Sequence, residues 1–160
     1  MNQAEKDLAL LEAAQKGDTE ACKLLLEQGA DIHTDNDLAL QWAAKNGHTE
    51  TCKLLLEHGA DIHVVNDDSI HKAASNGHTE TCKFLLEHGA TLHAGNHFAF
   101  RRAAERGHTE TYKLLLSHYK NLSGILKNPD VPELAKELAK KEQTRRAAKQ
   151  LKKTQPSLEI

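Results

Sequence analysis

The chain has 160 residues, of which 39% are hydrophobic and only six are aromatic, so we expect one domain with thin alanine and leucine layers. No segment approaches the ~18 consecutive apolar residues of a membrane span, and the N-terminus lacks a secretory pattern, so we expect a cytoplasmic protein without membrane association. The net charge of −2 is the sum of −6 over residues 1–120 (12 Lys/Arg and 18 Asp/Glu) and +4 over residues 121–160 (9 Lys/Arg and 5 Asp/Glu). The acidic body, residues 1–120, does not favour nucleic-acid binding.

One motif recurs four times at intervals of 30 residues. It reads GDTEACKLLLEQGADIH at 17–33, GHTETCKLLLEHGADIH at 47–63 and GHTETCKFLLEHGATLH at 77–93, and it returns shortened as GHTETYKLLLSH at 107–118. A single helical unit cannot cover this much leucine by itself. The period therefore predicts stacked units that share a core with their neighbours.

Residues 36–66 show how one unit is predicted to fold. A short helix with a narrow apolar stripe ends near Asn46, and Gly47 forms a tight turn. A second helix begins near Thr49, carries the leucine run and ends at Gly59, a left-handed C-cap. Each unit is thus predicted to be helix, turn, helix and loop. The expected N-caps of the first helices are Asn36, Asn66 and Asn96.

The string G-H-T-E-T-C-K-L-L-L-E-H-G-A-D resembles the second half of an ankyrin repeat, whose family pattern is G-H-x-E-V-V-x-L-L-L-x-x-G-A-D. The resemblance implies an all-α ankyrin-repeat solenoid of four helix-turn-helix units in a domain at 1–121. The units are expected at about 7–36, 37–66, 67–96 and 97–121. The T-P-L-H of the family is absent, and the period of 30 instead of ~33 predicts blunt loops in place of β-hairpin fingers. Compact units of this kind are similar to those of intracellular bacteria and giant viruses.

The first helices differ between units, whereas the second helices are nearly identical. In ankyrin proteins the first helices and loop tips line the concave surface on which partners bind, so the resemblance implies a protein-binding strip there. Trp, Phe and Arg in this strip suit a binding hot spot. For Trp42 and Phe98 the alternative is that both side chains pack into crevices between units. The expected partner-binding residues are Leu38, Gln41, Trp42, Lys45, Asp68, His71, Lys72, Phe98, Arg101, Arg102 and Glu105.

The cysteines and histidines recur in register with the units. Successive cysteines are expected ~8–10 Å apart, too far for a disulfide, which indicates small buried apolar residues instead of reactive thiols. Most histidines fall into three ladders with one member per unit, too widely spaced to share a zinc ion, so we expect structural roles. No catalytic motif is present, and we expect no enzyme activity, metal or cofactor. The cysteines are Cys22, Cys52 and Cys82, and the ladders are His48, His78, His108; His58, His88, His118; and His33, His63, His93.

The repeats end where Tyr119 replaces the C-cap glycine, and a linker at 122–130 follows. Asp130 and Glu133 form a capping-box pattern, with Pro132 in the first turn of a basic C-terminal helix predicted at 131–153. Leu134 and Leu138 are expected to dock this helix on the last unit as a cap, and 154–160 form a tail. Three alternatives remain for its basic half: a solvated end, a docking element for an acidic partner or for the acidic body, and a nuclear-import or nucleic-acid contact.

The resemblance implies a non-catalytic protein–protein interaction module, which acts as an adaptor or scaffold. We expect it to be a monomer. For a protein of an intracellular pathogen it implies an effector that binds a host protein in the host cytosol. The alternative is a structural role: self-association through residues 131–153, or an autoinhibited module whose basic helix docks on the repeats or on a second subunit.

Overall fold

The computed structural model describes residues 1–92, 98–119, 122–127, 129 and 131–154. Within these ranges the fold is all-α and contains no strand, which agrees with the blunt loops expected from the sequence. None of the described helices combines the length and apolarity that crossing a membrane requires. The helices are α1 (Gln3–Lys16), α2 (Thr19–Glu27), α3 (Thr34–Lys45), α4 (Thr49–Glu57), α5 (Val64–Ser75), α6 (Thr79–Glu87), α7 (Phe98–Glu105), α8 (Thr109–His118), α9 (Leu122–Lys127) and α10 (Glu133–Thr154).

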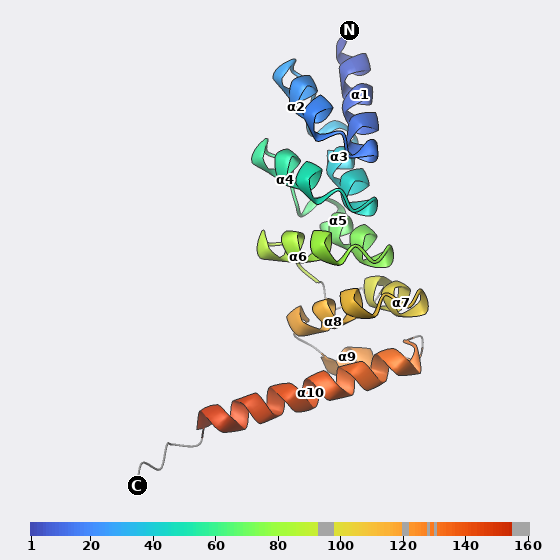
Figure 1. Ribbon diagram of the computed structural model, residues 1–160, viewed down its shortest axis with the longest axis vertical. Coiled ribbons are helices and arrows are strands. Elements are labelled where there is room, and N and C mark those ends of the chain that lie inside the picture. The colour runs from blue at the N-terminus through green and yellow to red at the C-terminus, as the bar shows by residue number, and fades with distance from the viewer. Residues whose placement is uncertain (93–97, 120–121, 128, 130, 155–160) are drawn as a thin grey trace.

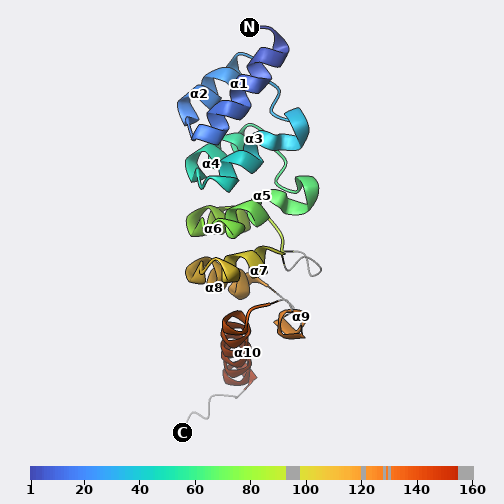
Figure 2. The same cartoon turned by 90° about the vertical axis from the view of Figure 1, so that its right-hand side faces the viewer.

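The first eight helices form two rows along the length of the molecule (Figures 1 and 2). In one row α1, α3, α5 and α7 contact each other in succession, and in the other α2, α4, α6 and α8 do so. The apolar stripe predicted for the first helices is buried, as Leu40, Ala43 and Ala44 show. Leu55 of the second helix is fully buried between its neighbours. Stacking therefore covers apolar surface that one unit alone would leave in water.

Polar contacts that repeat in register join the units. The hydroxyls of Thr49 and Thr81 share a hydrogen bond of 2.8 Å, and equivalent pairs form at the two neighbouring boundaries. His78 Nε2 shares a hydrogen bond of 3.0 Å with the Lys45 carbonyl. Its ring lies so close to Gly47 that a Cβ there would come within 2.5 Å of Nδ1. The second ladder also bonds to backbone, as His58 Nδ1 does to the Leu54 carbonyl at 2.9 Å.

The third histidine ladder bonds to buried carboxylates. His63 Nδ1 lies 2.8 Å from Asp67 Oδ1, and His33 makes the same contact with Asp37 at 3.0 Å. Asp67 also accepts hydrogen bonds from the backbone N–H and the hydroxyl of Thr91, which lies 24 residues further along the chain at the following loop. These aspartates thus fix each loop to its neighbour. His93 lies outside the described residues.

The N-cap prediction for Asn36 and Asn66 was wrong. Both residues have positive φ (59° and 55°) and lie in the middle of three consecutive left-handed residues at 35–37 and 65–67. The reason is tertiary: the left-handed turn brings the next residue, Asp37 or Asp67, into its buried hydrogen bonds. Asn96, the third expected cap, lies outside the described residues.

The end of the array is closed by α10, which crosses it and projects beyond α8 (Figure 1). Tyr119, in place of the C-cap glycine, is buried and its ring lies 4.7 Å from that of Phe100. The guanidinium of Arg146 donates to the carbonyls of Leu116, Ser117 and Tyr119 at the C-terminus of α8. A side chain from α10 thereby satisfies the Leu116 carbonyl, whose equivalents in the earlier units accept from the backbone N–H of the C-cap glycine.

The docking face of α10 differs from the expected one. Leu134 is 61% exposed and Leu138 only partly buried, whereas Ala135 and Ala139 are buried. The small side chains let α10 approach α8 closely enough for the Tyr112 hydroxyl to donate to the Ala135 carbonyl at 3.0 Å. The expected linker contains the short helix α9, and Asp130 of the expected capping box lies outside the described residues.

Candidate partner-binding site

An open pocket of about 210 Å³ lies where α3, α5 and α7 face the same side of the array. Its position follows from the stacking, since the end of α3 contributes Lys45, and α5 and α7 contribute equivalent positions such as Lys72 and Arg102. Six of the eleven residues expected from the sequence line it, together with three others. The lining residues are Lys45, Asp68, His71, Lys72, Ser75, Asn76, Phe98, Arg102 and Arg106.

Positive charge dominates this pocket. Lys45, Lys72, Arg102 and Arg106 line it, against one carboxylate, that of Asp68. Lys72 Nζ lies 2.6 Å from Asp68 Oδ2, so that carboxylate neutralises one of the four cations. The pocket is therefore a local positive region on a body with a negative charge balance, and acidic groups are the ligands it complements.

An aromatic platform forms one wall of the pocket. Phe98 is 44% exposed, with the guanidinium of Arg102 5.2 Å and that of Arg101 5.9 Å from its ring centroid. Glu105 lies 3.6 Å from both arginines, which orients them beside the ring. An exposed ring flanked by ordered guanidinium groups offers both apolar contact and charge-assisted hydrogen bonds.

Two of the expected binding residues are buried. Gln41 and His71 are each 5% exposed, because the next unit covers the side of the helix that carries them. Gln41 donates to the Asn36 carbonyl at 2.8 Å and accepts a hydrogen bond of 2.6 Å from Lys72. Gln41 therefore holds Lys72 in place at the edge of the pocket, and His71 forms part of its lining.

Leu38 and Trp42 lie toward the N-terminal side of the pocket. Both are partly buried and pack against the core with one side while another remains in solvent. Trp42 precedes Lys45 by one helical turn on α3 and does not itself line the pocket. The indole therefore packs in part, as in the packing alternative, and partner binding by its exposed part stays a prediction.

Three residues of the pocket were not among the expected ones: Ser75, Asn76 and Arg106. The Arg106 guanidinium donates to the Ser75 carbonyl at 2.9 Å and to Asn76 Oδ1 at 3.1 Å. The sequence offered one signal for it, since Arg106 occupies the position before the turn glycine that Asn46 and Asn76 hold in the preceding units. Asn46 already makes the equivalent bond to the Gln15 carbonyl of the previous unit at 3.1 Å, and Arg106 adds a second bond, to Asn76 Oδ1.

The cysteines lie away from this pocket, in the core. All three are free and buried, and burial raises the pKa of Cys22 to about 11 and the pKa values of Cys52 and Cys82 to about 12. The thiolate is the reactive form, so these thiols are inert near neutral pH. Across the described residues, no three His, Cys, Asp or Glu side chains are grouped so as to hold a metal ion.

The sequence matches a family model described as ankyrin repeats (3 copies), over residues 1–66 and 63–125. The matched ranges contain the whole pocket and end before α10. No curated protein matches the chain.

Proposed function

Since this chain belongs to the ankyrin repeat family, we propose that it is a non-catalytic adaptor whose α3–α5–α7 pocket binds an acidic segment of a partner protein. Ankyrin repeats generally mediate protein–protein interactions, and ankyrin repeat proteins are typically non-enzymatic binding modules. The observation that carries the proposal is the convergence of residues from three units on one positive pocket with an exposed aromatic wall.

The chemistry of the pocket supports a partner of this kind. A carboxylate of the partner would meet the guanidinium of Arg102 and the ammonium of Lys45. Within the described part of the chain Lys45 makes no ion pair, and the only ion pair of Arg102 is the 3.6 Å contact with Glu105. An apolar neighbour of that carboxylate would contact Phe98 and the exposed part of Trp42. Aromatic anchors beside arginine are the residue types that dominate interface energies.

The test is affinity capture with the purified chain, followed by calorimetry with each captured protein. Trp42→Ala and Arg102→Glu are measured beside the unchanged chain, and Lys53→Glu on the exposed side of α4 is the control. We expect Trp42→Ala to weaken binding by ~2 kcal/mol or more with little loss of helicity. A partner that binds all four proteins equally, or a Trp42→Ala variant that loses melting temperature but keeps its affinity, would falsify the proposed site.

A structural role is the second candidate, and the docking of Arg146 and Ala135 on α8 supports it. In this role α10 completes the array within one chain or pairs with a second subunit. Light scattering separates the two candidates, because self-association predicts a concentration-dependent dimer that deletion of residues 131–160 abolishes. A monomer at all concentrations that still binds partners supports the adaptor.

A further inference from the structure

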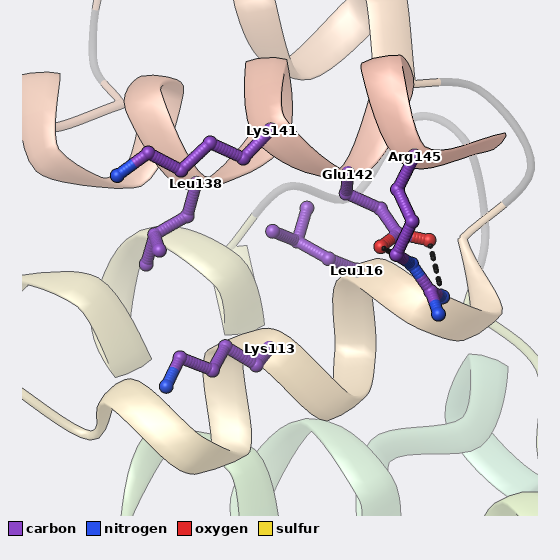
Figure 3. A pocket seen from close by; sticks show the side chains of 6 residues that line it. All are labelled: Lys113, Leu116, Leu138, Lys141, Glu142 and Arg145. Carbon is purple, nitrogen blue, oxygen red and sulfur yellow. Dashed lines mark hydrogen bonds and ion pairs between the residues drawn. The ribbon is translucent and has the colours of Figure 1, made fainter. Parts of the chain in front are cut away.

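A second groove, distinct from the α3–α5–α7 pocket, lies where α10 crosses α8 (Figure 3). It has a volume of about 260 Å³ and combines an apolar floor with a charged rim. Leu138 of α10, which is partly buried, forms the floor, with Leu116 of α8, 1% exposed, at its base. The rim consists of Lys113, Lys141, Glu142 and Arg145.

The groove exists because α10 does not repeat the packing of the earlier units. Between units, second helices of nine or ten residues lie side by side, as α6 and α8 do. α10 has 22 residues, contacts α7, α8 and α9, and runs past the end of α8 (Figure 1). Contact through Ala135 and Ala139 holds its first half close, and beyond these residues the two helices leave the groove between them.

The only carboxylate among the residues that line the groove is engaged within the chain. Glu142 accepts hydrogen bonds from Arg145 at 2.7 and 3.0 Å and from Arg146 at 2.9 Å. The hydrogen bond from Arg145 lowers the pKa of Glu142, so this group stays ionised and shared between two guanidinium groups. The rim therefore keeps a positive balance in spite of it.

A row of cations extends this rim along the projecting half of α10. Lys141, Arg145, Lys149 and Lys152 follow each other at spacings of four, four and three residues, which puts them on one side of the helix. All four are exposed, and within the described part of the chain the three lysines make no ion pair. Like charges at these spacings repel one another, and an anionic partner would relieve that repulsion.

We propose that the groove between α8 and α10 binds an acidic segment of a partner protein, with one apolar side chain seated on Leu116 and Leu138. The cationic row then pairs with carboxylates that follow this anchor along the segment. A protein segment fits better than a nucleic acid, because the floor of the groove is apolar and the repeats beside it carry a negative charge balance. This site is independent of the α3–α5–α7 pocket, with which it shares no lining residue.

The experiment measures fluorescence anisotropy of a short labelled Asp/Glu peptide with one central Leu, titrated with the full chain. The double variant Lys141→Glu/Lys149→Glu alters only exposed side chains of α10. Its matched control, Lys23→Glu/Lys53→Glu, makes the same change of charge on exposed positions of α2 and α4. We expect about tenfold weaker binding for the α10 variant, less than about twofold weaker binding for the control, and weaker binding as salt rises.

Two further comparisons make each outcome decisive. A peptide with Ser in place of its Leu is expected to bind several-fold more weakly, because it loses the anchor. The proposal is overturned if this peptide binds equally well, if both charge variants lose equal affinity, or if single-stranded RNA of equal charge binds as tightly as the peptide. Loss of binding only in Lys72→Glu/Arg102→Glu would assign the peptide to the α3–α5–α7 pocket, which also overturns this proposal and supports the other.

Discussion

The hydroxyls of Thr49 and Thr81 lie 2.8 Å apart and form a hydrogen bond between two units of the array. The pairs Thr19–Thr51 and Thr79–Thr111 repeat this bond at the other boundaries. Thr81 is 1% exposed, so water does not reach its hydroxyl. In each of the two internal units, one threonine thus bonds to the unit before it and another bonds to the unit after it.

Thr81→Val should reduce the free energy of unfolding by about 1 kcal/mol, because valine keeps the shape of the side chain and removes the hydrogen bond. Thr109→Val is the control, since Thr109 is exposed and bonds only weakly, at 3.4 Å, to the Gly107 carbonyl of its own turn. Its effect should stay within about 0.5 kcal/mol. Urea unfolding measures both, and equal losses would contradict a specific role for the Thr49–Thr81 bond.

Gly47→Ala should destabilise the protein more than Gly107→Ala. Both glycines have similar positive φ angles, 78° and 74°, so the backbone strain of roughly 1 kcal/mol is common to both. At Gly47 the new Cβ would also lie 2.5 Å from His78 Nδ1, whereas at Gly107 nothing lies within 4 Å. We expect a further loss of about 1 kcal/mol at Gly47, measured by urea unfolding. If the two variants unfold alike, the His78 ring does not restrict that turn.

Arg146→Ala should weaken the attachment of α10 to the repeats by about 2 kcal/mol, because it removes charged donors from the carbonyl ends of α8. Arg146→Lys should restore little of this lost energy, since an ammonium group cannot reproduce the planar guanidinium that donates to several carbonyls at once. Hydrogen exchange of the α10 amides reports the loss directly. Lys149→Ala, at an exposed position of the same helix, is the control and should leave these amides unchanged.

The three cysteines should be inert toward a thiol reagent in the native protein, at pH 7 and at pH 9 alike. Burial raises the pKa of Cys22 to about 11 and those of Cys52 and Cys82 to about 12, so the neutral thiol persists at both pH values. In urea all three should react at once. Their contribution to stability should be complete below about pH 8.5, where unfolded thiols are still protonated, and should be lost as the pH rises through 11 to 12. Rapid native reaction at pH 9 would contradict this.

The helical units could be predicted from the sequence because their causes are local and repeated. The apolar stripe of Leu40, Ala43 and Ala44, and the glycines at the turns, define two helices and a register without knowledge of the neighbours. The left-handed turns at 35–37 and 65–67 could not be predicted in this way. They depend on buried aspartates that accept hydrogen bonds from the following loop, 24 residues further along the chain.

The candidate site was predictable in its position and not in its details. The variable side chains of the first helices identified the strip, because shared packing keeps the other positions alike. Helix periodicity did not reveal that the next unit covers Gln41 and His71, since that depends on the spacing between units. Arg146 acts through carbonyls 27 to 30 residues away, a contact that no local pattern specifies, whereas the bond of Arg106 to the Ser75 carbonyl repeats that of Asn46 to the Gln15 carbonyl.

The boundaries between units are held together by side chains that every internal unit possesses. Among them are the paired threonines and the histidine that packs on the turn glycine. An in-frame tandem duplication of 30 residues would therefore insert one unit with a complete boundary and leave the two ends of the array unchanged. Tyr119 and Arg146 suit only the terminal copy, so growth by duplication must occur upstream of them. Evolution can thus add or remove whole units and change the length of the array without changing the contacts that cover its C-terminal end.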